Sequence, residues 1–307
     1  MKLLHEEASA RRLELVTVLV FGLWFIKLLP DPLARLALLP SALFEPVGFL
    51  ALVPSAVQPV LLSGPFLWFL KIATGLSIAL VLGNRARTPA ALVACACITL
   101  HLGIARGFAG NIGHQDLPLL YAAYWLALCR LAEWIAARAR PAGASGGCAQ
   151  PLRPEVPIIG TLAALCLTYT FVGIFRLVYG GLEAFAPESL TFWALRNSFH
   201  VLHPTWGLGK LLPEYPALTL LLTAGFPIVT AFEICAPLCL FSRRFRQLFL
   251  LVMVLFHFVS WLLLDIFFWE NLALLLLLVG RSSDAAVGQA KTQSVIVVAE
   301  RGGVRPA

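Results

Sequence analysis

Several ionisable side chains of this chain interrupt long apolar stretches, where they could bind a ligand or move a proton. His257 stands within LFHFVSW, Glu233 within AFEIC and Arg176 within GIFRL. An ionisable group in hydrocarbon costs roughly 2.5–3.5 kcal/mol on insertion scales, so each one requires a partner, a watery cavity or a function. Histidine titrates near neutral pH and suits proton transfer, whereas a permanently charged arginine suits holding an anion. These residue types therefore predict a polar pocket within the apolar stretches.

Other catalytic and metal-binding patterns are weak or absent in the sequence. His200 and His203 are three residues apart and could share one face of a helix, but the zinc signatures that pair histidines around a glutamate are missing. Polarity at a membrane interface explains this pair better than a metal ion, so no metal site is predicted. The sequence also has no P-loop, no Gly-x-Ser-x-Gly elbow and no Gly-rich dinucleotide fingerprint.

The composition indicates that the segments that carry these residues lie in a membrane. The 307 residues are 60% hydrophobic and 13% charged, with a mean hydropathy of +0.86. A soluble chain is typically about 45–50% apolar and about 25% charged, so a cytosolic enzyme, a nucleic-acid-binding domain and a disordered protein are excluded. The formal net charge of +7 predicts no nucleic-acid partner, because surplus basic residues of membrane proteins gather in cytoplasmic loops.

The apolar stretches predict an all-α, polytopic integral membrane helix bundle with about eight transmembrane helices. A span needs about 20 mostly apolar residues. Such stretches fall at 13–30, 64–82, 89–109, 117–137, 157–179, 217–241 and 245–264, with a shorter last one at 266–280. Segment 33–53 is also apolar, but its prolines favour a re-entrant or interfacial piece over a further span.

The longest outer connection, 180–216, contains a predicted amphipathic helix. Its apolar side is formed by Phe192, Leu195, Phe199 and Leu202, and its polar side by Arg196, Asn197, His200 and His203. This pattern is typical of a helix that lies at the outer interface of the membrane. Pro204 should end the helix, because proline has no amide donor and disfavours helix before it.

The basic residues assign an orientation to these spans. With the N-terminus inside, sixteen of the 23 lysines and arginines fall in inner segments, and five fall outside: Arg35, Arg106, Arg176, Arg196 and Lys210. Both termini are therefore predicted to be cytoplasmic, in the cell membrane. The chain divides into a first four-helix half (1–137), a cytoplasmic linker (138–156), a second four-helix half (157–280) and a mobile cytoplasmic tail (281–307).

This orientation gathers most of the unexplained polar residues on the extracytoplasmic side. They include Lys71, His101, His114, Arg176, His200, His257 and Asp265. Glu233 lies toward the inner half of its span. A polar pocket that opens outward is the economical interpretation. Lys27 is explained by snorkelling, and His257 has the alternative of a neutral histidine bonded to a neighbouring helix.

Four segments, in their order along the chain, carry a family resemblance. They are GNIGHQD (110–116), FVGIFRL (171–177), AFEICAPLCLFSRRFR (231–246) and LFHFVSWLLLDIFFWEN (255–271). The chain resembles the HTTM (horizontally transferred transmembrane) family, which includes the vitamin K-dependent γ-carboxylase. The resemblance implies a helical membrane domain with an extracytoplasmic active site and a reduced quinone as cofactor, and His114 matches the histidine of the family. The lysine of the family is Arg176 here, and arginine can hold an anion but cannot act as a base.

Two functions from different classes remain open. The first is an HTTM-like membrane enzyme or a protein that binds a quinone or a lipid, with a small peptide or protein as a further candidate substrate. Its candidate catalytic residues are His114, His257, Lys71 and Asp265, and its candidate cofactor-binding residues are Arg176, His101, His200 and Glu233. The second is a non-enzymatic membrane protein: a transporter, a maturation or immunity factor, or a scaffold for a partner.

Overall fold

Helices account for the regular structure in the computed structural model, which describes residues 2–109, 116–139, 152–199, 208–264, 266 and 268–280. No strand occurs in these ranges, so the predicted all-α fold class is confirmed. Proline occupies the first turn of four of the helices, where its missing N–H has no helical partner to lose. The main helices are α1 (Lys2–Leu28), α3 (Gly64–Leu82), α4 (Arg87–Ala109), α5 (Leu117–Arg138), α6 (Glu155–Gly180), α7 (Pro187–Ser198), α9 (Pro216–Ile234), α10 (Arg243–Leu264) and α11 (Trp269–Leu275).

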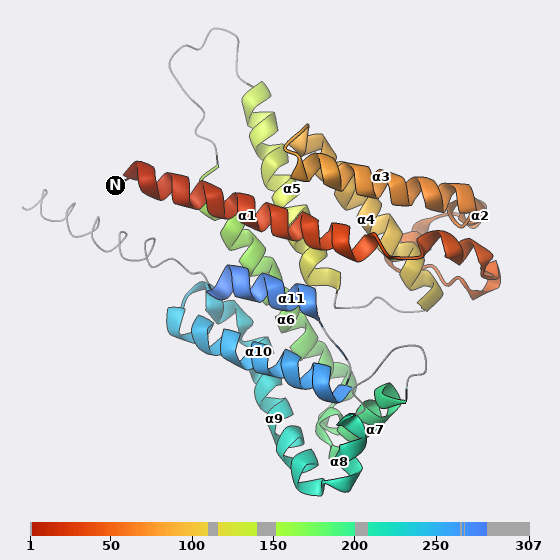
Figure 1. Cartoon of the computed structure of the whole chain (residues 1–307), viewed down its shortest axis with the longest axis vertical. Coiled ribbons are helices and arrows are strands. Elements are labelled where there is room, and N and C mark those ends of the chain that lie inside the picture. Colours follow the sequence, from red (N-terminus) through yellow and green to blue (C-terminus); the bar gives the residue numbers. More distant parts are fainter. Residues whose placement is uncertain are drawn as a thin grey trace, which may run out of the picture.

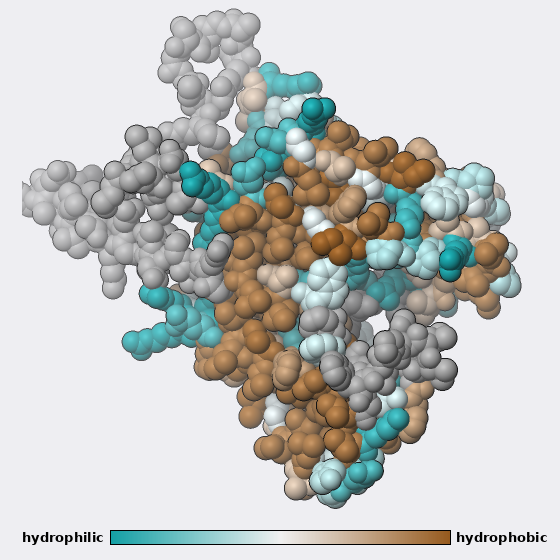
Figure 2. Space-filling view, in the orientation of Figure 1, coloured by the Kyte–Doolittle hydropathy of each residue, from teal (hydrophilic) through white to brown (hydrophobic). Residues whose placement is uncertain are grey.

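Seven helical segments are long and apolar enough to cross a membrane, which confirms a polytopic membrane helix bundle. They are Ser9–Leu38, Gly64–Leu82, Arg87–Ala109, Leu117–Arg138, Glu155–Gly180, Pro216–Ile234 and Arg243–Leu264. The shortest has 19 residues, which rise about 28 Å, close to the thickness of the hydrocarbon layer. Figure 2 shows apolar side chains across the middle of the visible face and hydrophilic ones mainly toward its ends.

The predicted spans at 217–241 and 266–280 are shorter helices in the structure. α9 stops at Ile234 and a 3-10 turn, η7 (Ala236–Leu240), follows, because Pro237 cannot continue the α-helical hydrogen bonds. Within the predicted span 266–280, α11 continues into a π-helical turn, η8 (Leu276–Gly280). The apolar helix over Trp269–Val279 rises only about 17 Å, which is too short to cross a bilayer by itself.

The apolar segment between α1 and α3 forms short turns of helix, as its prolines predict. It contains three 3-10 helices, η1 (Leu33–Leu38), η2 (Ser41–Leu43) and η3 (Gly48–Leu52), followed by the short α2 (Gln58–Leu61). The segment packs against α3 and α4 and builds a small second core there. The buried members of this core are Leu33, Phe44, Leu50, Leu67, Leu70 and Ile104.

One hydrophobic core joins the two predicted halves of the chain. It contains Trp24 of α1 and Ala123 of α5 together with Leu165 of α6 and Leu275 of α11. The indole Nε1 of Trp24 also donates a hydrogen bond to the backbone oxygen of Leu119 at 3.3 Å. Figure 1 shows α11 between α1 and α10, and α11 contacts both of them and α5. The last helix is therefore inserted among helices of both halves.

The predicted amphipathic helix is α7, but α7 ends at Ser198, well before Pro204. Its buried residues are small, because another backbone packs closely against it. A Cβ atom on Gly209 would lie only 2.7 Å from the backbone oxygen of Ala194. Phe192, on the other side of α7, is exposed, as expected of a helix at a lipid interface.

Candidate functional site

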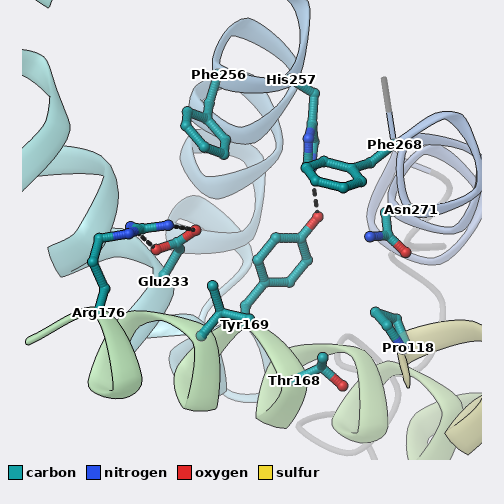
Figure 3. A pocket seen from close by; sticks show the side chains of 10 residues that line it. Pro118, Thr168, Tyr169, Arg176, Glu233, Phe256, His257, Phe268 and Asn271 are labelled. Carbon is teal, nitrogen blue, oxygen red and sulfur yellow. Dashed lines mark hydrogen bonds and ion pairs between the residues drawn. The ribbon is translucent and has the colours of Figure 1, made fainter. Parts of the chain in front are cut away.

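Five helices (α5, α6, α9, α10 and α11) and the residue before α11 line a small pocket of about 50 Å³ that is partly open to the outside. The close view in Figure 3 shows two polar pairs in the pocket, Arg176 with Glu233 and Tyr169 with His257. Helix α6 contributes one member of each pair. Aromatic side chains complete the wall. The lining residues are Pro118, Thr168, Tyr169, Val172, Arg176, Glu233, Phe256, His257, Phe268 and Asn271.

The first polar pair joins α6 to α10 inside the pocket. The hydroxyl oxygen of Tyr169 and Nε2 of His257 lie 2.8 Å apart and share a hydrogen bond. Both side chains are buried, and the ring of Phe268 meets the His257 ring edge-on at 5.5 Å. Nδ1 of His257 has no hydrogen-bond partner within the described part of the chain. Since the first nitrogen is held by Tyr169, the second is a buried polar atom without a partner among the described residues, which is uncommon in folded proteins.

The second polar pair joins α6 to α9. Nη1 and Nη2 of Arg176 both donate to the carboxylate of Glu233. Glu233 is only 1% exposed. Nη1 of Arg176 also donates to Oγ1 of Thr230 at 2.7 Å, and its guanidinium carbon lies 4.6 Å from the ring centre of Phe226. The two charges therefore compensate each other. An anionic ligand would therefore have to compete with Glu233 for the charge of Arg176.

The spacing along α6 explains why one helix serves both pairs. Tyr169 and Arg176 are seven residues apart, which is close to two helical turns, so they share a face. Gly173 lies between them and lets α9 approach: a Cβ atom there would be 3.1 Å from Cβ of Glu233 and closer still to Ile234. The absence of a side chain at this position thus permits the short arginine–carboxylate contact.

A second group of charges, which we call the four-charge cluster, lies beside the pocket. It comprises Lys27 of α1, Arg106 of α4, Asp116 before α5 and Glu270 of α11. Nζ of Lys27 contacts Oδ1 of Asp116 at 2.6 Å and also the carboxylate of Glu270. Nη2 of Arg106 binds Oδ2 of Asp116 at 2.5 Å. Two basic and two acidic groups balance, and they connect α1 and α11 to the junction between α4 and α5.

The cluster and the pocket share a wall. Asn271 lines the pocket and directly follows Glu270 of the cluster in the sequence. Pro118 also lines the pocket and is two residues after Asp116. Asn271 is 6% exposed, and within the described ranges its Oδ1 has no hydrogen-bond partner. A ligand in the pocket would therefore meet unsatisfied hydrogen-bonding atoms from both α10 and α11.

The structure places Lys71 and His101 outside this pocket. Nζ of Lys71 donates to the backbone oxygen of Asp31 at 2.6 Å. Nε2 of His101, fully buried in α4, lies 3.3 Å from Oδ2 of the same aspartate. These two residues thus belong to a separate polar contact near the end of α1. Lys27, for which snorkelling was expected, is held by carboxylates in the four-charge cluster instead.

Three of the predicted site residues come together: Arg176, Glu233 and His257 line the same pocket. Glu233 therefore neighbours the residues expected on the outer side, although it was assigned to the inner half of its span. His114, His200 and Asp265 lie outside the described residues. Within the described ranges, no three His, Cys, Asp or Glu side chains are grouped closely enough to hold a metal ion.

Sequence reasoning missed Tyr169, the partner of His257. A tyrosine in an apolar span is common as an interfacial or core residue, so its type alone is not informative. The available signal was its position seven residues before Arg176, on the same helical face. The partner on α10 is 88 residues away, and no local pattern predicts that contact.

Comparison with known proteins does not assign this chain to a family. No protein-family model, no curated protein and no solved structure matches the chain.

Proposed function

We propose that the chain is an integral membrane protein that binds a quinone, or a lipid-soluble ring of the same chemistry, in the pocket between α6, α10 and α11. The observation that carries this proposal is the buried Tyr169–His257 pair, with a 2.8 Å hydrogen bond on one histidine nitrogen and an unpartnered second nitrogen. A ligand oxygen is the natural partner of such a nitrogen in a buried site.

The other lining residues fit an aromatic ring with polar oxygens. Phe256 and Phe268 flank His257, with ring centres 5.4 and 5.5 Å from its own, and offer apolar faces and edges to a ring. Asn271 presents an amide with an unpartnered oxygen beside Phe268. An apolar tail would extend among the lipid chains around the helices, because the exposed side chains of these spans are apolar.

The roles of the chain's residues follow from these contacts. A bound quinone would supply two-electron, two-proton redox chemistry. His257 would bind a ring oxygen through Nδ1 and hold or deliver a proton there, while Tyr169 fixes the other nitrogen. Arg176 and Glu233 would form a neutral wall rather than an anion site. The lysine chemistry of the γ-carboxylase is not part of this proposal, since Arg176 stands at that position.

We further propose that the pocket opens on the extracytoplasmic side and that the chain is a distant HTTM-like protein. The distribution of basic residues and the order of the four sequence segments support these proposals. The transporter hypothesis is weak from the sequence, because Glu233 is the only acid of an inner half that could extend a polar path. Its pairing with Arg176 leaves that hypothesis without a specific supporting observation.

The proposal is tested by equilibrium binding of decylubiquinone to the protein in lipid nanodiscs. Tyr169→Phe removes one hydrogen bond to His257, and a hydrogen bond contributes about 0.5–1.5 kcal/mol, so binding should weaken roughly twofold to tenfold. His257→Gln should weaken binding at least as much, because it replaces the group that contacts the ligand.

A matched tyrosine outside the pocket provides the control. The hydroxyl of Tyr124 lies 2.7 Å from Oγ1 of Thr99 and contacts no pocket residue among the described hydrogen bonds. Tyr124→Phe should leave the affinity unchanged. If the Tyr169 and His257 variants fold and bind decylubiquinone as the unmodified protein does, the pocket is not the quinone site.

A further inference from the structure

The connection between α1 and α3, residues 30–63, has one face packed on the protein and one face with no protein partner among the described residues. It leaves the end of α1 and returns to the start of α3 without crossing the bundle, and Figure 1 shows it beside the ends of α3 and α4. We call this segment the proline-rich connection. It is distinct from the pocket, so its function does not depend on the proposed ligand.

The inner face of the proline-rich connection is fixed to α4 by two glycines. A Cβ atom on Gly107 would lie 2.3 Å from the ring of Phe44, and one on Gly103 would lie 2.8 Å from Cδ1 of Leu50. The backbone N–H of Glu45 donates to the backbone oxygen of Gly107 at 3.0 Å. The connection therefore has a defined place on the bundle and is not an unattached loop.

The outer face carries large apolar side chains. Leu38 is 83% exposed and Leu52 is 85% exposed, and Leu43, Phe49 and Val60 are exposed as well. Asp31, Arg35 and Glu45 are the charged residues of the connection, and Asp31 contacts Lys71 and His101. A water-facing loop of this size would normally be polar, and an exposed apolar patch of this kind indicates a membrane or a protein partner.

The backbone of the connection is largely paired within its own short turns. Its donors bind carbonyl groups three or four residues earlier, for example Leu39 to Leu36, Phe44 to Ser41 and Val53 to Leu50, at 3.0 Å in each case. Its prolines have no N–H that would need a partner. Local pairing of this kind lowers the cost of placing a backbone against lipid, where water cannot satisfy it.

Continuity with a membrane-spanning helix favours lipid over a protein partner. The connection leads directly into α3, whose Trp68, Phe69 and Ile72 are exposed on a helix long enough to cross a bilayer. Exposed apolar side chains thus occur on both the connection and the start of the span that follows it. Irregular backbone is not found exposed in the hydrocarbon layer itself, so the connection belongs at its boundary.

We propose that the proline-rich connection is an interfacial anchor, whose Leu38, Leu43 and Leu52 side chains insert among the acyl chains of one leaflet. This assigns the segment to the interface and excludes a re-entrant path through the hydrocarbon. The leaflet is the one at the end of α1 that holds Lys27, next to the four-charge cluster. The backbone rests on the glycines of α4 while the outer side chains contact lipid.

Photolabelling of the full chain tests the anchor. A leucine analogue with a diazirine group is placed at position 38 or 52, and the protein is irradiated in phosphatidylcholine–phosphatidylglycerol vesicles. Both side chains are exposed, so the analogue should not disturb the fold. Intact-mass spectrometry should then show covalent adducts of phospholipid mass at both positions.

Two further positions calibrate the result. Leu221, which is 70% exposed on the spanning helix α9, should also give lipid adducts. Arg85, in the exposed turn between α3 and α4, should give water adducts. Water adducts at positions 38 and 52, as at Arg85, would overturn the proposal. A covalent dimer at these positions would also overturn it and would identify the face as a contact between copies of the chain.

Discussion

Each charged side chain in the described part of the bundle that bears on the pocket has a specific partner. Arg176 is compensated by Glu233, and Lys27 by Asp116 and Glu270. An unpaired charge within an apolar span costs free energy, so the fold requires these contacts. The atoms that remain unpartnered near the pocket, Nδ1 of His257 and Oδ1 of Asn271, are therefore the ones that a ligand would use.

The arginine–carboxylate pair leads to a prediction about stability. Glu233→Gln leaves the charge of Arg176 without a counterion in a buried site, and breaking a buried pair costs on the order of 3 kcal/mol. We expect a clear fall in the melting temperature measured by scanning fluorimetry in detergent. The double variant Arg176→Met, Glu233→Leu removes both charges and should recover most of the loss.

An exposed carboxylate serves as the comparison for this prediction. Glu188 lies on the surface at the start of α7, so Glu188→Gln should change the melting temperature little. An equal effect of the two glutamine substitutions would show that the pair with Arg176 does not stabilise the protein.

At the scale of elements, glycines determine which segments can approach each other. Gly173 admits α9 to α6 beside the pocket, and Gly107 admits Phe44 to α4. Gly75 in α3, by contrast, has no atom within 4 Å of the position that a Cβ would take. The same residue type thus has different structural roles at these positions.

This difference can be measured with two identical substitutions. Gly107→Ala forces the Phe44 ring away and should destabilise the protein by about 1–3 kcal/mol, as overpacking typically does. Gly75→Ala should be neutral or stabilising by up to about 1 kcal/mol, since alanine favours helix over glycine. Melting temperatures check both values, and faster proteolysis within residues 33–61 should accompany the first variant only. Equal stability of the two variants would contradict the close packing of Phe44 on α4.

The sequence predicted the elements better than their contacts. Length and apolarity alone identified the seven long spans, because a bilayer imposes both properties on a helix. The end of α9 could have been taken from Pro237, whereas the close packing of α7 against Gly209 joins residues more than ten positions apart and has no local sequence signal. The pocket partners Tyr169 and His257 come from helices distant in the sequence, and polar residue type predicted only the histidine.

At the scale of the whole molecule, the short last helix lies beside α1 and runs antiparallel to it. Glu270 at the start of α11 contacts Lys27 near the end of α1. Near the other end, Nη2 of Arg12 donates to the backbone oxygen of Leu278 at 3.3 Å. The helix is shorter than the stretch of α1 beside it, and the long lysine and arginine side chains bridge the difference. This arrangement brings Leu278 next to Arg12, and together with the distribution of basic residues it leads us to predict that residue 280 lies on the cytoplasmic side.

A topology measurement checks this arrangement. Green fluorescent protein fused after residue 280 should fluoresce in bacterial cells, and alkaline phosphatase fused at the same point should be inactive, because both results require a cytoplasmic position. A second pair of fusions in the outer 180–216 connection should give the opposite pattern. Active phosphatase after residue 280 would contradict the predicted cytoplasmic position of this point of the chain.

The central claim is that the pocket beside Tyr169 and His257 holds a quinone-like ligand. The most direct test is a density map of the protein purified from its native membrane in mild detergent. The account predicts ring-shaped density between Phe256 and Phe268, with an oxygen within hydrogen-bonding distance of Nδ1 of His257. A well-resolved pocket that contains only water, or that is closed by protein side chains, would contradict it.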